Sequence, residues 1–177
     1  MSLAALLRWA LGIALLLAAG WIVLSAERTA PPIEPGLAAP EFALPRLGGG
    51  EISLSELRGK VVLLNFWATW CAPCEQEMPA MQRLYAQLAS RGFELVAVSV
   101  DDDAGAVARF RERLALGFPI ALDPRREAAE LYQSYRYPES FLIDREGTLV
   151  ARYIGERDWD APEYSARILR LLEAQPK

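Results

Sequence analysis

The sequence predicts an α/β domain in which helices cover both faces of a mixed β-sheet. Two apolar runs with β-branched content, KVVLLNFW from residue 60 and FELVAVSV from residue 93, are short enough to be buried central strands. A helical pattern follows each run, and the chain ends in strand, turn, strand and an amphipathic helix. Strand–helix alternation favours parallel pairing and the strand–turn–strand favours antiparallel pairing, so the expected sheet is mixed.

The first 26 residues are predicted to be a transmembrane signal-anchor. Residues 3–25 are apolar except for Arg8, and about 20 such residues suffice to cross a bilayer as a helix. Trp9 and Trp21 lie near the two ends, where indole rings favour the membrane interface. A cleaved signal peptide is the competing interpretation, although its apolar core would span only about 7–15 residues. Arg8 should keep the N-terminus cytoplasmic, which places the rest of the chain outside the cytoplasmic membrane.

Residues 27–40 are rich in Pro and Ala and are predicted to be a tether, followed by one domain at 41–177. Within the domain, LGGGE at 47–51 indicates a hairpin turn between two short strands. The net charge of −4 belongs to the part of the chain after residue 35, which disfavours nucleic acid as a partner.

A helix is predicted after the second cysteine, with apolar residues at three- and four-residue spacing, a kink at Pro79 and a stop at Gly92. The remaining helices are expected at 104–117, 126–133 and 162–175, and the remaining strands at 118–123, 140–144 and 148–155. The three aspartates at 101–103 are interpreted as a solvated turn that supplies a helix N-cap.

The chain contains no histidine, which excludes whole classes of function. Catalysis by Ser-His-Asp or Cys-His is impossible, and a zinc site would depend on cysteines and carboxylates alone. Neither a Walker loop nor a dinucleotide-binding fingerprint occurs in the sequence. We therefore expect no cofactor and no metal.

The only two cysteines, Cys71 and Cys74, lie where a predicted buried strand leads into a helix. Cys71 is expected at or near the helix N-cap, with Cys74 one turn further on the same face. The free N–H groups and the helix dipole there favour a thiolate at Cys71. Pro73 is tolerated in the first turn, and Trp67 and Trp70 are expected to shield the pair from water.

Three roles are conceivable for this pair. A structural disulfide that closes so short a loop would reduce chain entropy very little. A zinc site would need further ligands from a second copy of the chain, because no third cysteine is present. A redox-active dithiol is favoured, and C-x-x-C near a βαβ pattern is a thioredoxin-like signal.

The stretch FWATWCAPCEQEMP resembles the membrane-anchored TlpA/ResA-like branch of the thioredoxin-like superfamily, which includes thiol-disulfide oxidoreductases of cytochrome c maturation. The resemblance covers residues 36–174 and includes the N-terminal hairpin and the stretch YPESFLIDREG, which matches the family's proline loop. It implies a thioredoxin-like fold with a redox-active Cys71–Cys74 disulfide, in which Cys71 attacks and Cys74 resolves. It also implies a cis peptide at Pro138, facing the disulfide.

Six further residues are expected to support the site. Trp70 and Pro73 flank the cysteines, and Glu77 matches the helix pattern after them. Tyr137, Pro138 and Glu139 form the proline loop, where Arg136 replaces a common glycine.

A base near the dithiol would help, because only the thiolate attacks a disulfide. Glu77 and Glu139 are candidates for this base, whereas Glu75 fits a solvated first-turn carboxylate. For Glu77 a plain surface charge stays an equal alternative. Trp159 is interpreted as a packing residue.

The leading hypothesis is a thiol-disulfide oxidoreductase on the outer face of a bacterial inner membrane, acting on protein disulfides. The resemblance implies a reductase that takes electrons from a membrane thiol transporter and passes them to apocytochrome c or another exported protein. A disulfide oxidase or isomerase is the alternative, because direction depends on a reduction potential that the sequence does not fix. A peroxiredoxin-like peroxide reductase shares the fold, but its cysteine typically lies in a T-x-x-C setting.

Overall fold

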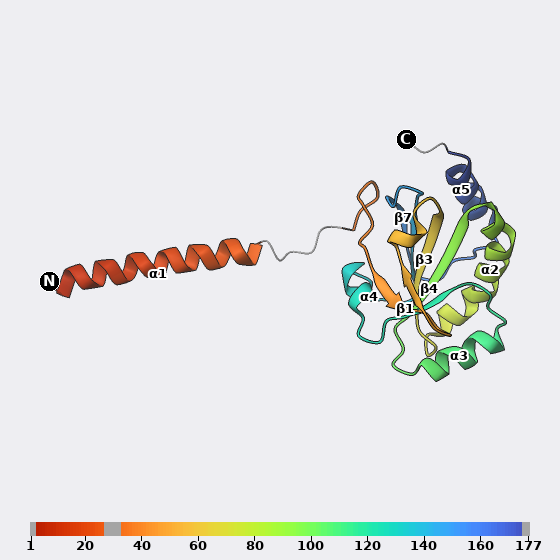
Figure 1. Ribbon diagram of the computed structural model, residues 1–177, viewed down its shortest axis with the longest axis horizontal. Coiled ribbons are helices and arrows are strands. Elements are labelled where there is room, and N and C mark those ends of the chain that lie inside the picture. Colours follow the sequence, from red (N-terminus) through yellow and green to blue (C-terminus); the bar gives the residue numbers. More distant parts are fainter. Residues whose placement is uncertain (1–2, 27–32, 175–177) are drawn as a thin grey trace. The chain divides into compact units, whose positions relative to one another are not determined.

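The computed structural model describes residues 3–26 and 33–174 (Figure 1). The chain divides into two compact units, Met1–Pro32 and Ile33–Lys177. The first unit contains a single described helix, α1 (Leu3–Ala26), where the sequence predicted one. Among the residues available for this test, no helix is both long and apolar enough to cross a membrane. The transmembrane anchor therefore stays a prediction.

The second unit contains a five-stranded mixed sheet in the order β5-β4-β3-β6-β7 and a separate two-stranded hairpin, β1-β2. β3 pairs in parallel with β4, and β4 with β5, whereas β6 and β7 pair antiparallel. This arrangement confirms the predicted mixed sheet. The strands are β1 (Ala43–Pro45), β2 (Glu51–Ser53), β3 (Val61–Trp67), β4 (Phe93–Ser99), β5 (Ile120–Leu122), β6 (Glu139–Ile143) and β7 (Leu149–Ile154).

Helices cover both faces of the sheet, as predicted (Figure 1). One face carries α2, α3 and α5, and the other carries α4 and the hairpin. The helices are α2 (Ala72–Leu88), α3 (Ala104–Arg113), α4 (Glu127–Leu131) and α5 (Pro162–Glu173), and short 3₁₀ turns occupy η1 (Ser55–Leu57) and η2 (Ala89–Arg91). α2 continues through Pro79, and the chain turns at Gly92 in a left-handed conformation, as the predicted stop requires.

The alternation of side chains along β3 distributes the core between the two faces. Every residue of β3 is buried. Trp67 packs against Phe110 of α3 with ring centroids 4.7 Å apart, whereas Phe66 contacts Tyr132 beyond α4 on the other face at 5.4 Å. Asn65 shares the face of Trp67 and therefore lies under α2, where it meets the site described below.

The domain begins earlier than the sequence predicted. Ile33 and Ala39 are buried, and the Ala39 N–H donates to the carbonyl of Gly147 over 2.9 Å. The structure therefore assigns residues 33–40 to the domain, although their Pro- and Ala-rich composition indicated a tether. Residues 27–32 of the predicted tether lie outside the described part of the chain.

Asp103 caps α3, as predicted for the run of aspartates. Its carboxylate accepts the N–H of Gly105 over 2.8 Å. Removing this cap in Asp103→Ala should lower the free energy of unfolding, because the N–H of Gly105 then loses its acceptor. Asp102→Ala removes the same charge from an exposed neighbour that does not cap α3 and should change stability much less. Urea denaturation of both variants measures the difference, and equal effects would exclude a capping role.

Candidate active site

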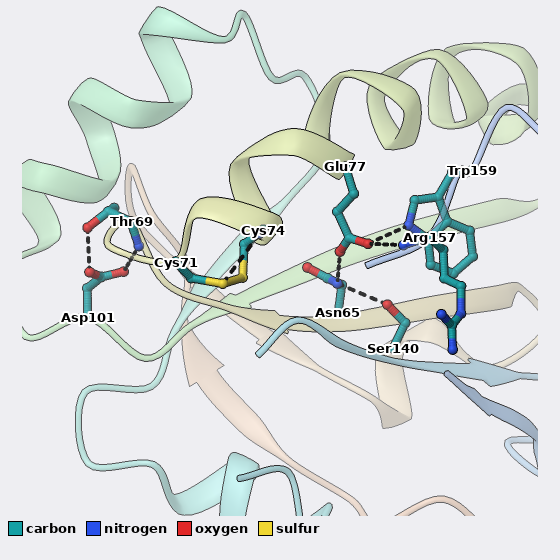
Figure 2. The surroundings of a disulfide bond; sticks show 9 residues. All are labelled: Asn65, Thr69, Cys71, Cys74, Glu77, Asp101, Ser140, Arg157 and Trp159. Carbon is teal, nitrogen blue, oxygen red and sulfur yellow. Dashed lines mark hydrogen bonds between the residues drawn. A yellow bond between two sulfur atoms is a disulfide. The ribbon is translucent and has the colours of Figure 1, made fainter. Parts of the chain in front are cut away.

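The two cysteines form a disulfide at the start of α2 (Figure 2). Cys71 is the N-cap residue, and its sulfur accepts the backbone N–H of Cys74 over 3.3 Å. Cys71 is 6% exposed and Cys74 is fully buried. The order of exposure agrees with an attacking Cys71 and a resolving Cys74, although Cys71 is more buried than the sequence suggested.

The segment that leads into Cys71 is held by Asp101. This carboxylate accepts the backbone N–H of Thr69 over 2.9 Å and its hydroxyl over 2.6 Å (Figure 2). It also accepts the hydroxyl of Ser99 over 2.7 Å. Asp101 is buried, so the interpretation of all three aspartates as a solvated turn was wrong for this one. Its hydrogen bonds fix the turn that presents Cys71 at the helix end.

The proline loop reaches the same end of the sheet. The Tyr137–Pro138 peptide bond is cis, as the resemblance implied. Because Glu139 pairs with Phe66 in the ladder between β6 and β3, the loop before β6 lies at the end of β3 that leads to Cys71.

Aromatic rings connect this loop to the cysteines. The ring of Tyr137 packs edge-on against Trp70, with centroids 6.1 Å apart. Trp70 is 65% exposed, whereas Trp67 is buried in the core. The two tryptophans therefore do not form a joint shield, and Trp70 with Tyr137 instead lines an open cavity of about 330 Å³.

Glu77 lies one turn after Cys74 and is only 2% exposed. One carboxylate oxygen accepts the side-chain amide of Asn65 over 2.9 Å. The other oxygen accepts the backbone N–H of Arg157 over 3.1 Å and the indole N–H of Trp159 over 3.0 Å (Figure 2). These contacts exclude the surface-charge alternative for Glu77.

Burial raises the pKa of Glu77 from 4.5 to about 7, against the opposing effect of its hydrogen bonds. A carboxyl group with this pKa is suited to take a proton from a thiol near neutral pH. Its position three residues after Cys74 places it on the same helix face as that thiol. Glu77 is therefore the carboxyl group best placed to act as the base.

The other two glutamates are engaged elsewhere. Glu139 is buried and pairs with Arg152 over 2.5 Å. It neighbours Ser140 on β6, so its side chain leaves the face of the sheet that carries Glu77. Glu75 is partly exposed and pairs with Arg113, which lowers the pKa of Glu75 chiefly through their hydrogen bond. Glu75 is thus a first-turn carboxylate in contact with solvent, as the sequence indicated. The ion pair with Arg113 was not predicted.

Three contributions were missed by sequence reasoning. Asn65 was read only as part of an apolar strand, although a polar residue in such a run was a usable signal. Trp159 is buried, as predicted for a packing residue, but it also donates a hydrogen bond to Glu77. Asp101 gave no signal apart from its two neighbouring aspartates. Among the described residues, no group of three or more Cys, Asp or Glu side chains is placed to hold a metal ion.

Comparisons with known proteins agree with this geometry. The model of the AhpC/TSA family matches residues 35–152. The thiol-disulfide oxidoreductase ResA of a Bacillus cereus strain is 43% identical over 122 residues, which make up 69% of this chain and 70% of that protein. The chain belongs to the ResA-like thiol-disulfide oxidoreductases of the AhpC/TSA family.

Solved structures place this ResA-like chain in the same fold. A crystal structure assigned as thiol:disulfide interchange protein DsbE from Chlorobium tepidum is 38% identical, with a TM-score of 0.74 over 80% of this chain and 99% of that one. StoA from Bacillus subtilis is 28% identical, with a TM-score of 0.63 over 76% and 99% of the two chains. The fold is therefore thioredoxin-like, and the two cysteines form its C-x-x-C motif.

The two thiols of the reduced ResA-like chain should differ in reactivity. Cys71 keeps some exposure and lies at the helix N-terminus, where the dipole stabilises a thiolate, whereas Cys74 is fully buried. Alkylation near neutral pH should therefore modify Cys71 faster, by roughly tenfold or more. Mass spectrometry of the modified peptides measures both rates. Equal rates, or faster modification of Cys74, would reverse the assignment of roles.

Proposed function

We propose that the chain reduces protein disulfides outside the cytoplasmic membrane. The observation that carries this proposal is the buried carboxyl group of Glu77, one turn after Cys74 and with a pKa of about 7. A reductase must deprotonate its resolving thiol at each turnover, because the thiolate and not the thiol attacks. Glu77 supplies a base for this step on the same helix face.

The reaction begins when the Cys71 thiolate attacks one sulfur of a substrate disulfide. A mixed disulfide forms, and the other substrate sulfur leaves as a thiolate that takes a proton from water. Cys74 then gives its proton to Glu77 and attacks the Cys71 sulfur. The substrate's first sulfur leaves as a thiolate and is protonated, so the substrate gains two electrons and the chain ends as the disulfide seen in the structure.

The direction of exchange is tested with one pair of reactions. The reduced full-length chain is mixed with a protein disulfide such as that of insulin, and the oxidised chain is mixed with a reduced, unfolded protein. We expect the first reaction to be faster and to go further toward completion. Preferred oxidation of the unfolded protein would instead assign the chain as a disulfide oxidase or isomerase.

We further propose that the apolar segment 3–25 anchors the chain in a bacterial inner membrane, with the catalytic domain in the periplasm. Its length and composition support this placement. The matching partners are a membrane thiol transporter as electron donor and apocytochrome c or another exported protein as acceptor. Fractionation of cells tests the anchor: the chain should stay with washed membranes, and a released form that starts near residue 27 would contradict it.

A further inference from the structure

The carboxyl group of Glu77 is surrounded by hydrogen-bond donors. The amide of Asn65, the backbone N–H of Arg157 and the indole N–H of Trp159 all point at its two oxygens (Figure 2). A carboxylate accepts such bonds, but a protonated carboxyl group also carries an O–H that needs an acceptor. The observed arrangement therefore satisfies the charged form of Glu77 and leaves the neutral form without a partner for its proton.

Asn65 is the one member of this group that can change from donor to acceptor. It is fully buried in β3, and its amide nitrogen donates to Glu77 and to the hydroxyl of Ser140, both over 2.9 Å. Its own carbonyl oxygen, Oδ1, is buried and has no hydrogen-bond partner in the described part of the chain. Rotation of the amide by half a turn would exchange Oδ1 and Nδ2. The indole N–H of Trp159 and the backbone N–H of Arg157 can only donate.

We infer that the side-chain amide of Asn65 turns over whenever Glu77 gains or loses its proton. With Glu77 charged, the amide nitrogen faces the carboxylate, as observed. With Glu77 protonated, Oδ1 faces it and accepts the new O–H. The hydroxyl of Ser140 follows in both states, because it accepts from the nitrogen in one and donates to Oδ1 in the other.

The inference rests on the proposed function in one respect: the proton is the one that Cys74 gives up. Asn65 is then a positioning residue that holds the catalytic carboxyl group in both protonation states. In either orientation, one of the two amide atoms, Oδ1 or Nδ2, lacks a hydrogen-bond partner. Rotation of the amide therefore costs no additional hydrogen bond when Glu77 gains or loses its proton. A fully paired amide would resist this change.

The surroundings of Glu77 are consistent with a carboxyl group that changes state near neutral pH. Cys74 on α2 is neutral in the disulfide, and the neighbours on β3 and β6 are uncharged. The charged groups line the same cavity of about 370 Å³ as Glu77, between α2 and residues 156–160; they are Arg83, Glu156, Arg157, Asp158 and Asp160. Burial raises the pKa of Glu77 to about 7, and Glu156 adds to this increase. Both protonation states of Glu77 are thus populated near pH 7, so Asn65 has to form a hydrogen bond with either state.

Asn65 is the only asparagine in the chain, so ¹⁵N-asparagine labels a single side-chain amide. NMR spectra of the full-length oxidised chain can follow this amide from pH 5 to 9. At pH 9 its protons should show cross-peaks to the β protons of Ser140, and these should disappear at pH 5 with a midpoint near 7. Cross-peaks that persist unchanged through the titration of Glu77 would overturn the inference.

Glu77→Gln provides the matched spectrum of the turned state. The glutamine oxygen can accept the two fixed donors, Arg157 and Trp159, which directs its NH₂ group at Asn65. The amide of Asn65 should then present Oδ1 at every pH, and its spectrum should match that of the wild type at pH 5. A spectrum that matches the wild type at pH 9 would contradict the inference.

Two substitutions distinguish a switching partner from a fixed donor. Trp159→Phe removes a donor that serves only the charged form, so the midpoint of the Glu77 carboxyl ¹³C titration should rise by about one pH unit. Asn65→Leu removes a partner of both forms and should move that midpoint by less than about half a unit. If the midpoint of the Glu77 titration rises as much in Asn65→Leu as in Trp159→Phe, Asn65 is a fixed donor and the inference is overturned.

These measurements do not depend on turnover. If the Asn65 amide rotates but the chain does not exchange disulfides, this inference is supported and the proposed function is wrong. If the Asn65 amide stays fixed but the chain exchanges disulfides, the proposed function is supported and this inference is wrong.

Discussion

Replacing Cys71 by serine is expected to reduce disulfide exchange to the uncatalysed rate, because the chain then lacks its attacking sulfur. Replacing Cys74 by serine should instead let the first attack proceed and stop the second, so that mixed disulfides between Cys71 and the substrate accumulate. The different exposure of the two sulfurs and the N-cap position of Cys71 are the reasons for this asymmetry.

The two outcomes can be read on non-reducing gels after the thiols have been blocked with an alkylating agent. Cys74→Ser should give bands of higher mass that disappear on reduction, and Cys71→Ser should give none. The double substitution serves as the control for non-specific crosslinks. Adducts that form on Cys74 in the Cys71→Ser variant would show that the roles are reversed.

Replacing Glu77 by glutamine should have opposite effects on rate and stability. The variant lacks the base for Cys74, so exchange should slow by about 10²-fold near neutral pH. The folded protein holds the Glu77 proton up to about pH 7, whereas the unfolded chain releases it near 4.5. The wild type therefore loses stability as the pH rises between these values, by about 3 kcal/mol, and the variant should escape this loss.

Urea denaturation at pH 4, 6 and 8 tests the stability of both proteins. The free energy of unfolding of Glu77→Gln, relative to the wild type, should increase across this range and level off above pH 7. Glu75→Gln is the matched control, because Glu75 is partly exposed on the same helix and its carboxylate pairs only with Arg113 among the contacts described. Its exchange rate should stay near that of the wild type. If the free energies of unfolding of Glu77→Gln and the wild type differ by the same amount at all three pH values, Glu77 does not titrate in this range.

Much of the fold follows from local patterns in the sequence. The runs that became β3 and β4 could be predicted because strands buried on both faces are nearly continuous apolar runs. The N-cap position of Cys71 follows from the junction between a strand and a helix, and the cis bond at Pro138 came from resemblance to a family.

The rest of the site depends on contacts between distant residues. The sequence left a surface charge and an active-site carboxylate as equal alternatives for Glu77, because its burial depends on Trp159 and Arg157, about 80 positions later. Asp101 looked like one of three solvated aspartates, and only the fold brings Thr69 onto it. Residues 33–40 have the composition of a tether but pack on the domain through backbone bonds that composition does not encode.

Cys71 and Cys74 are expected to form a reductive two-electron couple. Equilibration of the full-length chain with mixtures of reduced and oxidised glutathione, followed by alkylation and mass spectrometry, measures its reduction potential. We expect both cysteines to change together in one reversible transition, with a midpoint at or below about −220 mV, in the range of glutaredoxins and thioredoxin. A midpoint near −120 mV would instead indicate an oxidant and would contradict a reductive couple.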